Sequence, residues 1–553
     1  MTGKIRNILF VMYDQLRFDY LGCGGHPHLK TPNFDRVAAM GVRFSNAYCQ
    51  SPICGSSRMS FYTGRYVQSH GSEWNGFPLR VGEKTMGDHL RELGMQCWLI
   101  GKTHMRADTE GMQRLGIAPD SVIGVRTAEC GFDIWVRDDG MVPEGTDGSY
   151  DGRVSPYNEW LKTRGYPGPN PWAHYANSGI EDGRIAPGWL MRHAGRQANV
   201  REEESETPWL TDRALEFLHE QNGPWCAHLS YIKPHWPYIA PAPYHAMYGP
   251  NHVPAARRHE RELADAHPVF AAFAQGQIGR SFHSDETRRK VIPAYMGLIK
   301  QCDDHLGRVL DRLEATGAMD DTMIVLTSDH GDYLGDHWMG EKMFFHECSV
   351  KIPLIVYDPS VEADATRGTV CDALVESIDL AATFVEVAGG EVPTHWIEGR
   401  SLQPRLHGEA PQDWRQVAIS EYNYSVTPAA AKLRVSDEDA RLFMAFDGRW
   451  KLIHFEGGFR PMLFDLESDP DEFTDLGKSP DHADQIARLY RHLNAWARRQ
   501  SQRVTRSAAD LAAMRGKSRR RGILLGVYGE GDIDEELLVK DVGRAERDFT
   551  REE

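Results

Sequence analysis

The sequence has no run of roughly 20 apolar residues, the length that a membrane-spanning helix requires. Near its beginning, the apolar run of residues 8–13 is closed at once by Asp14, and no cleavage-like site follows it. Such a run is too short for a secretory signal. These absences predict a cytoplasmic protein that has no membrane partner.

Cysteine is also scarce and irregularly placed. The nine cysteines form no Cys-x-x-Cys pair and show no repeated spacing. An odd, scattered set in a large chain argues against a disulfide framework and is typical of reduced thiols in a cytosol.

Basic residues are outnumbered by acidic ones, 63 against 79, which gives a formal net charge of −16. This balance repels polyanions, so we expect no nucleic acid partner. A small anionic substrate is compatible with this net charge if cations and a metal at the binding site outweigh the repulsion from the acidic residues elsewhere in the chain. The 41% of hydrophobic and 26% of charged residues are those of a globular protein with a large core.

Short apolar runs alternate with helical patterns along most of the chain. Strands are expected at residues 8–13, 97–100, 227–231, 323–327 and 353–357, and helices at 34–40, 86–93, 211–219 and 291–315. This alternation predicts an α/β fold with a large, mostly parallel sheet sandwiched by helices. Residues 150–200 and 236–285 are rich in Pro, Gly, His and Trp, and we expect them to form long loops or insertions that wall a pocket.

The pattern changes after about residue 410. Short strand-like pieces at 417–422, 442–446, 451–455 and 461–464 precede a helical stretch at 483–499. We therefore predict a large α/β domain at 1–410, a small subdomain with an antiparallel sheet and one helix at 411–500, and an extended C-terminal arm at 501–553. The arm contains a basic run, residues 515–521, and too little apolar content for its own core, so we expect it to lie between subunits.

Two aspartates occupy equivalent places in this pattern. Asp14 and Asp329 each follow an expected strand directly. Ligands of such sheets bind beyond the carboxyl ends of the strands, so the two residues can meet at one site. A lone aspartate after a strand is also a common helix N-cap, and for either residue alone that alternative stays open.

Cys54 is followed by Gly55, Ser56 and Ser57, and then by Arg58. If a helix begins here, its free N–H groups and the positive end of its dipole lie near Cys54, and Arg58 lies on the same face. A nucleophile in such a place suits an anionic, tetrahedral transition state. On spacing alone, the plainer interpretation is favoured, in which Cys54 is one buried thiol among nine.

The stretch around Cys54 resembles the type I sulfatases and phosphonate monoester hydrolases of the alkaline phosphatase superfamily. Their signature is Cys-x-Pro-x-Arg, after a Thr-Pro-Asn helix and an Arg-Phe-x-Asn-Ala-Tyr strand, and Cys54 and Arg58 match it. The resemblance implies an alkaline phosphatase-like fold and a cysteine that a formylglycine-generating enzyme oxidises to formylglycine. Ser56 stands where the family usually has proline, a position that the converting enzymes read.

The same resemblance implies one divalent metal. Asp14 and Gln15 match the first ligand pair of the family, Asp329 and His330 match the second, and the modified Cys54 completes the set. Carboxylate oxygens suit a hard cation such as Ca²⁺, and the imidazole nitrogen favours Mn²⁺.

Five further side chains take their roles only from the resemblance. Lys102 and His104 match a Lys-x-His element, in which the lysine contacts the ester oxyanion and the histidine the aldehyde hydrate. His235 matches a histidine that faces the leaving group, and Lys342 matches a substrate-binding lysine. Asn75 matches an asparagine that touches the transferred group in phosphonate monoester hydrolases. Taken singly, each has a structural alternative as a solvated or hydrogen-bonded residue.

These residues together predict a hydrolase of sulfate monoesters. The hydrated aldehyde at position 54 is expected to attack sulfur, while the metal and three side chains neutralise the sulfate oxygens, namely Arg58, Lys102 and Lys342. His235 is expected to protonate the leaving oxygen, and His104 to deprotonate the second hydroxyl.

Two alternatives remain beside this prediction. A phosphonate monoester or phosphodiester hydrolase with the same site is the first, and an unmodified, non-catalytic binding protein is the second. The resemblance also implies a small anionic ester as substrate and a homo-oligomer, either a dimer or a tetramer.

Overall fold

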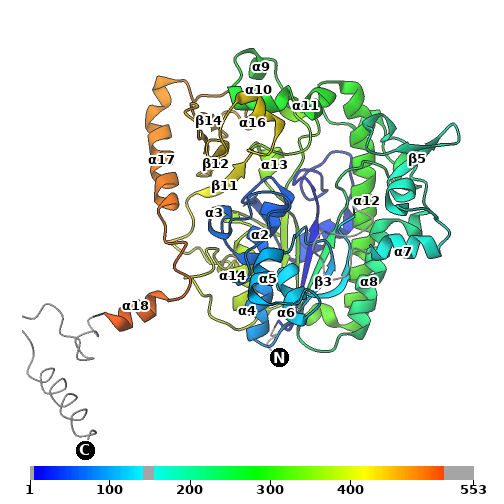
Figure 1. Ribbon diagram of the computed structural model, residues 1–553, viewed down its shortest axis with the longest axis horizontal. Coiled ribbons are helices and arrows are strands. Elements are labelled where there is room, and N and C mark those ends of the chain that lie inside the picture. The colour runs from blue at the N-terminus through cyan, green and yellow to red at the C-terminus, as the bar shows by residue number, and fades with distance from the viewer. Residues whose placement is uncertain (1–4, 141–154, 516–553) are drawn as a thin grey trace, which may run out of the picture. The chain divides into compact units, whose positions relative to one another are not determined.

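A computed structural model describes residues 5–140 and 155–515 of the chain. Its largest element is an eight-stranded sheet with the strand order β10-β2-β9-β8-β1-β7-β3-β4. Figure 1 shows the chain as a ribbon. The central strand β1 (Asn7–Tyr13) pairs in parallel with β8 (Thr322–Ser328) and with β7 (Trp225–Tyr231). All residues of these three strands are buried, which explains why they read as continuous apolar runs.

The rest of the sheet is mostly parallel, as the sequence predicts. Strand β3 (Gln96–Gly101) pairs with β7 and with β4 (Asp133–Arg137), and β10 (Thr369–Glu376) pairs in parallel with β2 (Val42–Tyr48). Only β9 (Leu354–Tyr357), among the described strands of this sheet, runs antiparallel to its neighbours β2 and β8.

Helices cover both faces of the sheet. Phe10 of β1 lies in an apolar cluster with side chains of α2 (Cys54–Thr63), α4 (Met86–Glu92) and α14 (Asp379–Val387). The next residue, Val11, points to the other face and lies in a second cluster with side chains of α1 (Pro32–Met40), α8 (Glu206–Glu220) and α12 (Asp285–Thr316). The predicted sandwich of helices around a large sheet is confirmed.

The regions expected to be long loops or insertions contain short helices and a hairpin. The described part of residues 150–200 includes α7 (Pro156–Thr163) and a hairpin of β5 (Ser178–Glu181) and β6 (Arg184–Pro187). Residues 236–285 include the short helices α9 (Arg261–Ala264), α10 (Pro268–Ala274) and α11 (Gln277–Phe282). The sequence did not reveal these short elements, because helices of eight residues or fewer span too few turns to show a period.

A second, smaller sheet follows the large one in the sequence. Its four antiparallel strands are β11 (Ala418–Asn423), β12 (Arg441–Phe446), β13 (Trp450–Phe455) and β14 (Met462–Asp465). Helix α17 (Ala483–Ala497) packs against β12 and β13. The predicted antiparallel sheet with one helix is confirmed.

The chain divides into two compact units. One holds Met1–Val392 and Ile397–Arg499 and therefore both sheets, and the other holds Pro393–Trp396 and Gln500–Glu553, with helix α18 (Ala508–Met514). The predicted boundaries at residues 410 and 500 stay predictions. Residues 516–553 of the predicted arm, with most of its basic run, lie outside the described residues. No helix within the described ranges is both long and apolar enough to cross a membrane.

Candidate active site

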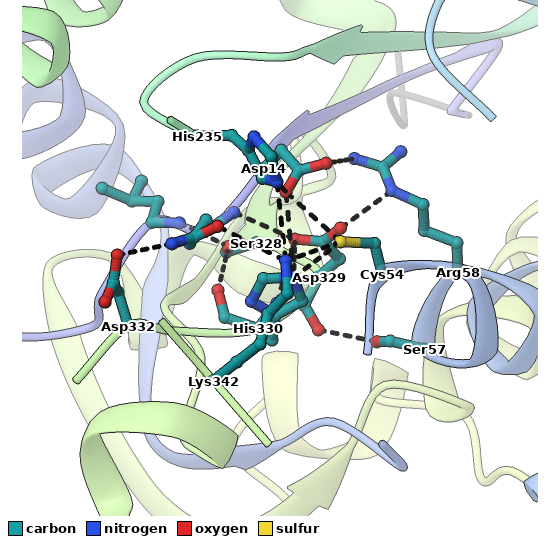
Figure 2. Close-up of polar contacts among 12 residues, drawn as sticks. Asp14, Cys54, Ser57, Arg58, His235, Ser328, Asp329, His330, Asp332 and Lys342 are labelled. Atoms are coloured by element: carbon teal, nitrogen blue, oxygen red, sulfur yellow. Dashed lines mark hydrogen bonds and ion pairs between the residues drawn. The ribbon is translucent and has the colours of Figure 1, made fainter. Parts of the chain in front are cut away.

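Two aspartates meet at the carboxyl edge of the large sheet (Figure 2). Tyr13 of β1 is aligned with Ser328 of β8, so Asp14 and Asp329 leave neighbouring strands at the same level. Both are fully buried, and His330 Nε2 lies 3.8 Å from Asp14 Oδ1 and 3.7 Å from Asp329 Oδ1. The expectation that these distant segments meet at one place is confirmed.

Cys54 is the first residue of α2, where the sequence places a helix start. Its Sγ atom lies 3.1 Å from His330 Nε2, 3.0 Å from Lys342 Nζ and 3.8 Å from Asp14 Oδ1. Burial, together with the negative charge of Asp14, raises the pKa of the Cys54 thiol to about 11. Among these groups an unmodified thiol is uncharged at neutral pH and is a poor nucleophile.

The Arg58 guanidinium lies against the two carboxylates. Its Nε donates to Asp329 Oδ2 at 2.8 Å and its Nη2 to Asp14 Oδ2 at 3.2 Å, while Nη1 donates to the Lys102 carbonyl and to Ser230 Oγ. Burial alone would raise the pKa of Asp14, but the charges of Lys102 and Arg58 help to hold it well below its usual value. All three nitrogens donate to protein groups, so Arg58 positions the two carboxylates, and its expected role toward the sulfate oxygens stays a prediction.

Two lysines reach the cluster from different segments. Lys102 follows β3, and its Nζ lies 2.6 Å from Asp14 Oδ2. Lys342 lies in the segment after β8, and its Nζ lies 3.4 Å from Gln15 Oε1. Together with Arg58, these side chains bring three cations to two carboxylates. Buried cations gathered in this way suit an anionic ligand.

His235 faces the same cluster (Figure 2). Its Nδ1 lies 2.6 Å from the Trp236 carbonyl, so we assign the ring hydrogen to Nδ1. Its Nε2 is then an acceptor, 3.5 Å from Lys342 Nζ. Burial lowers the pKa of His235 well below its ordinary value, so the ring is neutral near pH 7. It can donate to a leaving oxygen only after it takes up a proton, a condition that the sequence does not reveal.

His104 and Asn75 lie at the border of the cluster. Burial, and then the charge of Lys102, lower the pKa of His104 well below its ordinary value. The His104 Nδ1 atom is buried and has no hydrogen-bond partner among the described residues. Asn75 Oδ1 accepts the Gly55 N–H at 2.8 Å, in the first turn of α2. The structure thus brings all eleven side chains that the sequence singled out to one region.

The donor set fits a divalent cation. Ligand atoms of Asp14, Cys54, Asp329 and His330 all lie within 4.8 Å of one another. His330 Nδ1 lies 2.8 Å from the Gly331 carbonyl, so we assign the ring hydrogen to Nδ1, and the Nε2 lone pair then faces two carboxylate oxygens. Lone pairs arranged in this way repel one another unless a cation lies between them. Burial lowers the pKa of His330, which keeps this nitrogen available to a metal.

A second group of possible ligands, Glu262, His337 and His346, is less suited to an ion. His337 Nδ1 lies 2.6 Å from Glu262 Oε1, and the two imidazoles stack with 3.8 Å between their centres and 11° between their planes. An imidazole binds a metal in the plane of its ring, so two stacked rings cannot both direct lone pairs at one ion. His337 instead forms an ion pair with Glu262.

The sequence reasoning missed three residues that support the cluster. Ser57 Oγ donates to the Asp329 carbonyl at 2.6 Å, and Asp332 and Tyr238 both bond the side chain of Gln15. Asp332 is visible in the Ser-Asp-His-Gly-Asp motif, and Tyr238 in the Lys-Pro-His-Trp-Pro-Tyr segment. Neither motif, however, predicts that its last residue hydrogen-bonds to Gln15.

Comparison with known proteins agrees with this site. The sulfatase family profile matches residues 6–390, and the profile of the N-sulphoglucosamine sulphohydrolase C-terminal region matches residues 335–499. The chain belongs to the sulfatase family. It is 32% identical over 515 residues to the multifunctional alkaline phosphatase superfamily protein PehA of Trinickia caryophylli, across 87% of this chain and 93% of that protein. It is 26% identical to an arylsulfatase of Clostridium perfringens, across 87% and 92% of the two chains.

Solved structures give the same result. The phosphonate monoester hydrolase of Silicibacter pomeroyi superposes with a TM-score of 0.78 and 32% identity, over 90% of this chain and 96% of that one. The phosphonate monoester hydrolase of Agrobacterium radiobacter gives 0.76 and 29%, over 89% and 95%. The resemblance to sulfatases and phosphonate monoester hydrolases of the alkaline phosphatase superfamily, inferred from motifs, is confirmed.

Proposed function

We propose that the protein hydrolyses sulfate monoesters at this cluster, with a formylglycine made from Cys54 and one divalent metal, Ca²⁺ or Mn²⁺. The position of Cys54 carries the proposal. Its Sγ atom lies at the start of a helix, 3.0 Å from Lys342 Nζ, in one group of possible ligands with Asp14, Asp329 and His330. Membership of the sulfatase family supports the same conclusion.

The metal and the modified residue supply chemistry that the ordinary side chains lack. A bound divalent metal polarises an ester oxygen and lowers the pKa of a hydroxyl beside it. We assign its binding to Asp14, Gln15, Asp329 and His330, together with position 54. The hydrated aldehyde offers two hydroxyl groups on one carbon, so the bond to the transferred group can be broken without a second attack on sulfur.

The other side chains bind the ester and move protons. We assign Lys102 and Lys342 to the oxygens of the transferred group, where charge develops. His104 is neutral, because burial and Lys102 lower its pKa, and we assign it the proton of the second hydroxyl at position 54. His235 is assigned to the leaving oxygen, to which it donates once it is protonated.

A phosphonate monoester or phosphodiester hydrolase with the same site is the second candidate. The likeness to two solved phosphonate monoester hydrolases favours it, as does Asn75 beside the first turn of α2. Both esters present a tetrahedral anion to the same cations. A non-catalytic binding protein with an unmodified Cys54 is the third candidate, and the raised pKa of the thiol is compatible with it.

We also propose the setting in which the protein works. The substrate is a small anionic ester, a formylglycine-generating enzyme is a partner, and the chain works in the cytoplasm as a dimer or tetramer held by the arm at 501–553. The three cations at the site support an anionic substrate. The nine cysteines, none of which forms a disulfide, support the cytoplasmic location.

The test is the mass of the peptide that contains residue 54, followed by kinetics. Conversion replaces sulfur and two hydrogens by one oxygen, and we expect the converted form to dominate in active protein. The ratio of kcat/KM for an aryl sulfate to that for a phenyl phosphonate ester then separates the first two candidates, with Cys54→Ala as the inactive control. An unaltered cysteine in protein that turns over either ester contradicts the proposed nucleophile.

A further inference from the structure

The side-chain amide of Gln15 can be placed in two ways, and its neighbours select one. At one end, Nε2 donates to Asp332 Oδ2 at 2.5 Å and lies 3.2 Å from the Tyr238 hydroxyl. At the other end, Oε1 lies 3.4 Å from Lys342 Nζ, on the side of the cluster. The amide therefore lies between a carboxylate and an ammonium group.

Both oxygens of the Asp332 carboxylate, which bonds Gln15, accept hydrogen bonds. Asp332 is buried, and its Oδ2 accepts from both Gln15 and the Tyr238 hydroxyl, the latter at 2.5 Å. Its Oδ1 accepts the Leu334 N–H at 3.0 Å. Rotation of the amide by half a turn would set Gln15 Oε1 against this carboxylate and Nε2 against Lys342. Both contacts would be repulsive, so only one orientation is compatible with Asp332.

The backbone of Gln15 is held as firmly as its side chain. Gln15 has φ of 65°, a left-handed conformation that is unfavourable for a residue with a side chain. Its N–H donates to Asp329 Oδ1 at 3.1 Å, and its carbonyl accepts from the Tyr295 hydroxyl at 2.7 Å. These contacts fix the point from which the amide extends.

We propose that Asp332, with Tyr238, is a positioning residue that holds the amide oxygen of Gln15 toward the metal site and so makes Gln15 a neutral oxygen ligand. The inference rests on the proposed metal. Asp332 lies outside the set of ligands and acts through Gln15 alone. Groups that orient metal ligands in this way typically change metal affinity by 10- to 100-fold when they are replaced.

The experiment measures metal affinity directly, by competition of the purified protein with a chelator for Mn²⁺. Asp332 accepts from Gln15 and Tyr238 at Oδ2 and from Leu334 at Oδ1, whereas asparagine has a single acceptor oxygen, so Asp332→Asn leaves at least one of these contacts unmade. We expect this variant to bind Mn²⁺ about 10- to 100-fold more weakly. The conservative Tyr238→Phe variant removes a single hydroxyl, and we expect a smaller loss in the same direction.

A pair of substitutions, at positions 15 and 332, distinguishes a positioning role of Asp332 from a general loss of structure. Gln15→Glu sets a second carboxylate against Asp332 and should weaken Mn²⁺ binding. Adding Asp332→Asn places an amide donor against the new carboxylate at position 15, so the double variant should bind Mn²⁺ more tightly than Gln15→Glu alone. Asp303→Asn is the matched control, because Asp303 is also a buried acceptor but takes its hydrogen bonds from the N–H groups of Asn33 and Phe34 at the start of α1.

The outcomes distinguish this inference from the proposed function. Wild-type affinity in Asp332→Asn, or no recovery in the double variant, overturns the positioning role while leaving the metal in place. A wild-type protein that binds neither Mn²⁺ nor Ca²⁺ overturns the metal itself, and the positioning role with it. Thermal unfolding of each metal-free variant shows whether it is folded.

Discussion

Arg58 is the residue on which the arrangement of the two aspartates depends. It is fully buried and bonds both Asp14 and Asp329, so its loss would leave two buried carboxylates without their shared partner. Breaking a buried pair in this way costs about 3–5 kcal/mol of stability. Arg58 therefore both holds the two carboxylates in place and balances their negative charge.

We predict that Arg58→Ala lowers the free energy of unfolding by about that amount and abolishes turnover, and that Arg58→Lys lies between it and the wild type. Urea denaturation of the metal-free proteins measures the effect. Arg36→Ala is a matched control, since Arg36 pairs with the exposed Asp311 at the surface and should have little effect. Equal losses in Arg58→Ala and Arg36→Ala would contradict the prediction.

Glu421 gives the folded protein a dependence on pH. Burial, reinforced by Glu398 and Glu73, raises its pKa from an ordinary 4.5 to about 8. Between these values the folded state holds a proton that the unfolded state releases. Stability from this group is therefore lost as pH rises from about 4.5 to about 8, by about 1 kcal/mol for each pH unit.

We predict that Glu421→Gln removes this loss. The amide oxygen can still accept the Gln68 N–H, which lies 3.1 Å from Glu421 Oε1. The variant should match the wild type near pH 5 and exceed its unfolding temperature by a widening margin toward pH 8. Parallel melting curves over this range measure the difference. A margin that does not change with pH would rule out the raised pKa.

At the scale of elements, one strand connects the small sheet to the active site. Lys451 of β13 is fully buried, and its Nζ donates to the Phe345 carbonyl at 3.1 Å, to Glu347 Oε1 at 2.8 Å and to Glu472 Oε1 at 2.7 Å. Phe345 lies three residues after Lys342. The small sheet therefore helps to fix the segment that carries a candidate catalytic lysine.

We predict that Lys451→Met destabilises the protein by about 3–5 kcal/mol, because two carboxylates lose their buried partner. Lys478→Ala, which removes an ion pair to Asp265 that is exposed at both ends, is the matched control and should melt like the wild type. Differential scanning calorimetry measures both. A Lys451→Met protein as stable as its control would show that the buried charges are not needed.

Elements differ in how far the sequence predicted them. The strands β1, β7 and β8 were predictable because parallel strands buried on both faces appear as continuous apolar runs. The meeting of Asp14 with Asp329 followed from their places at strand ends. The support of Gln15 by Asp332, and the contacts of Arg58 with both carboxylates, depend on tertiary distances that no local pattern encodes. The short helices of the insertions were missed because they lack a period.

At the scale of the whole molecule, the site and the C-terminal segment belong to different compact units. Both sheets and every candidate site residue lie in the unit that ends at Arg499. We predict that a chain ending there folds and binds one metal per subunit, while light scattering reports a smaller assembly than that of the full chain. Metal analysis and circular dichroism give the control. A truncated chain that keeps the full assembly would exclude the arm as its basis.

The burial of Cys54 by later segments of the chain limits when its side chain is accessible during synthesis. The groups that close over it come late in translation, since His330 and Lys342 follow it by 276 and 288 residues. At ribosomal speeds of 5–20 residues per second, they emerge roughly 15–60 s afterwards. In the finished molecule only 1% of the cysteine is exposed. If Cys54 is converted as proposed, the enzyme that oxidises it therefore has its opportunity on the nascent polypeptide, before these two segments have been made.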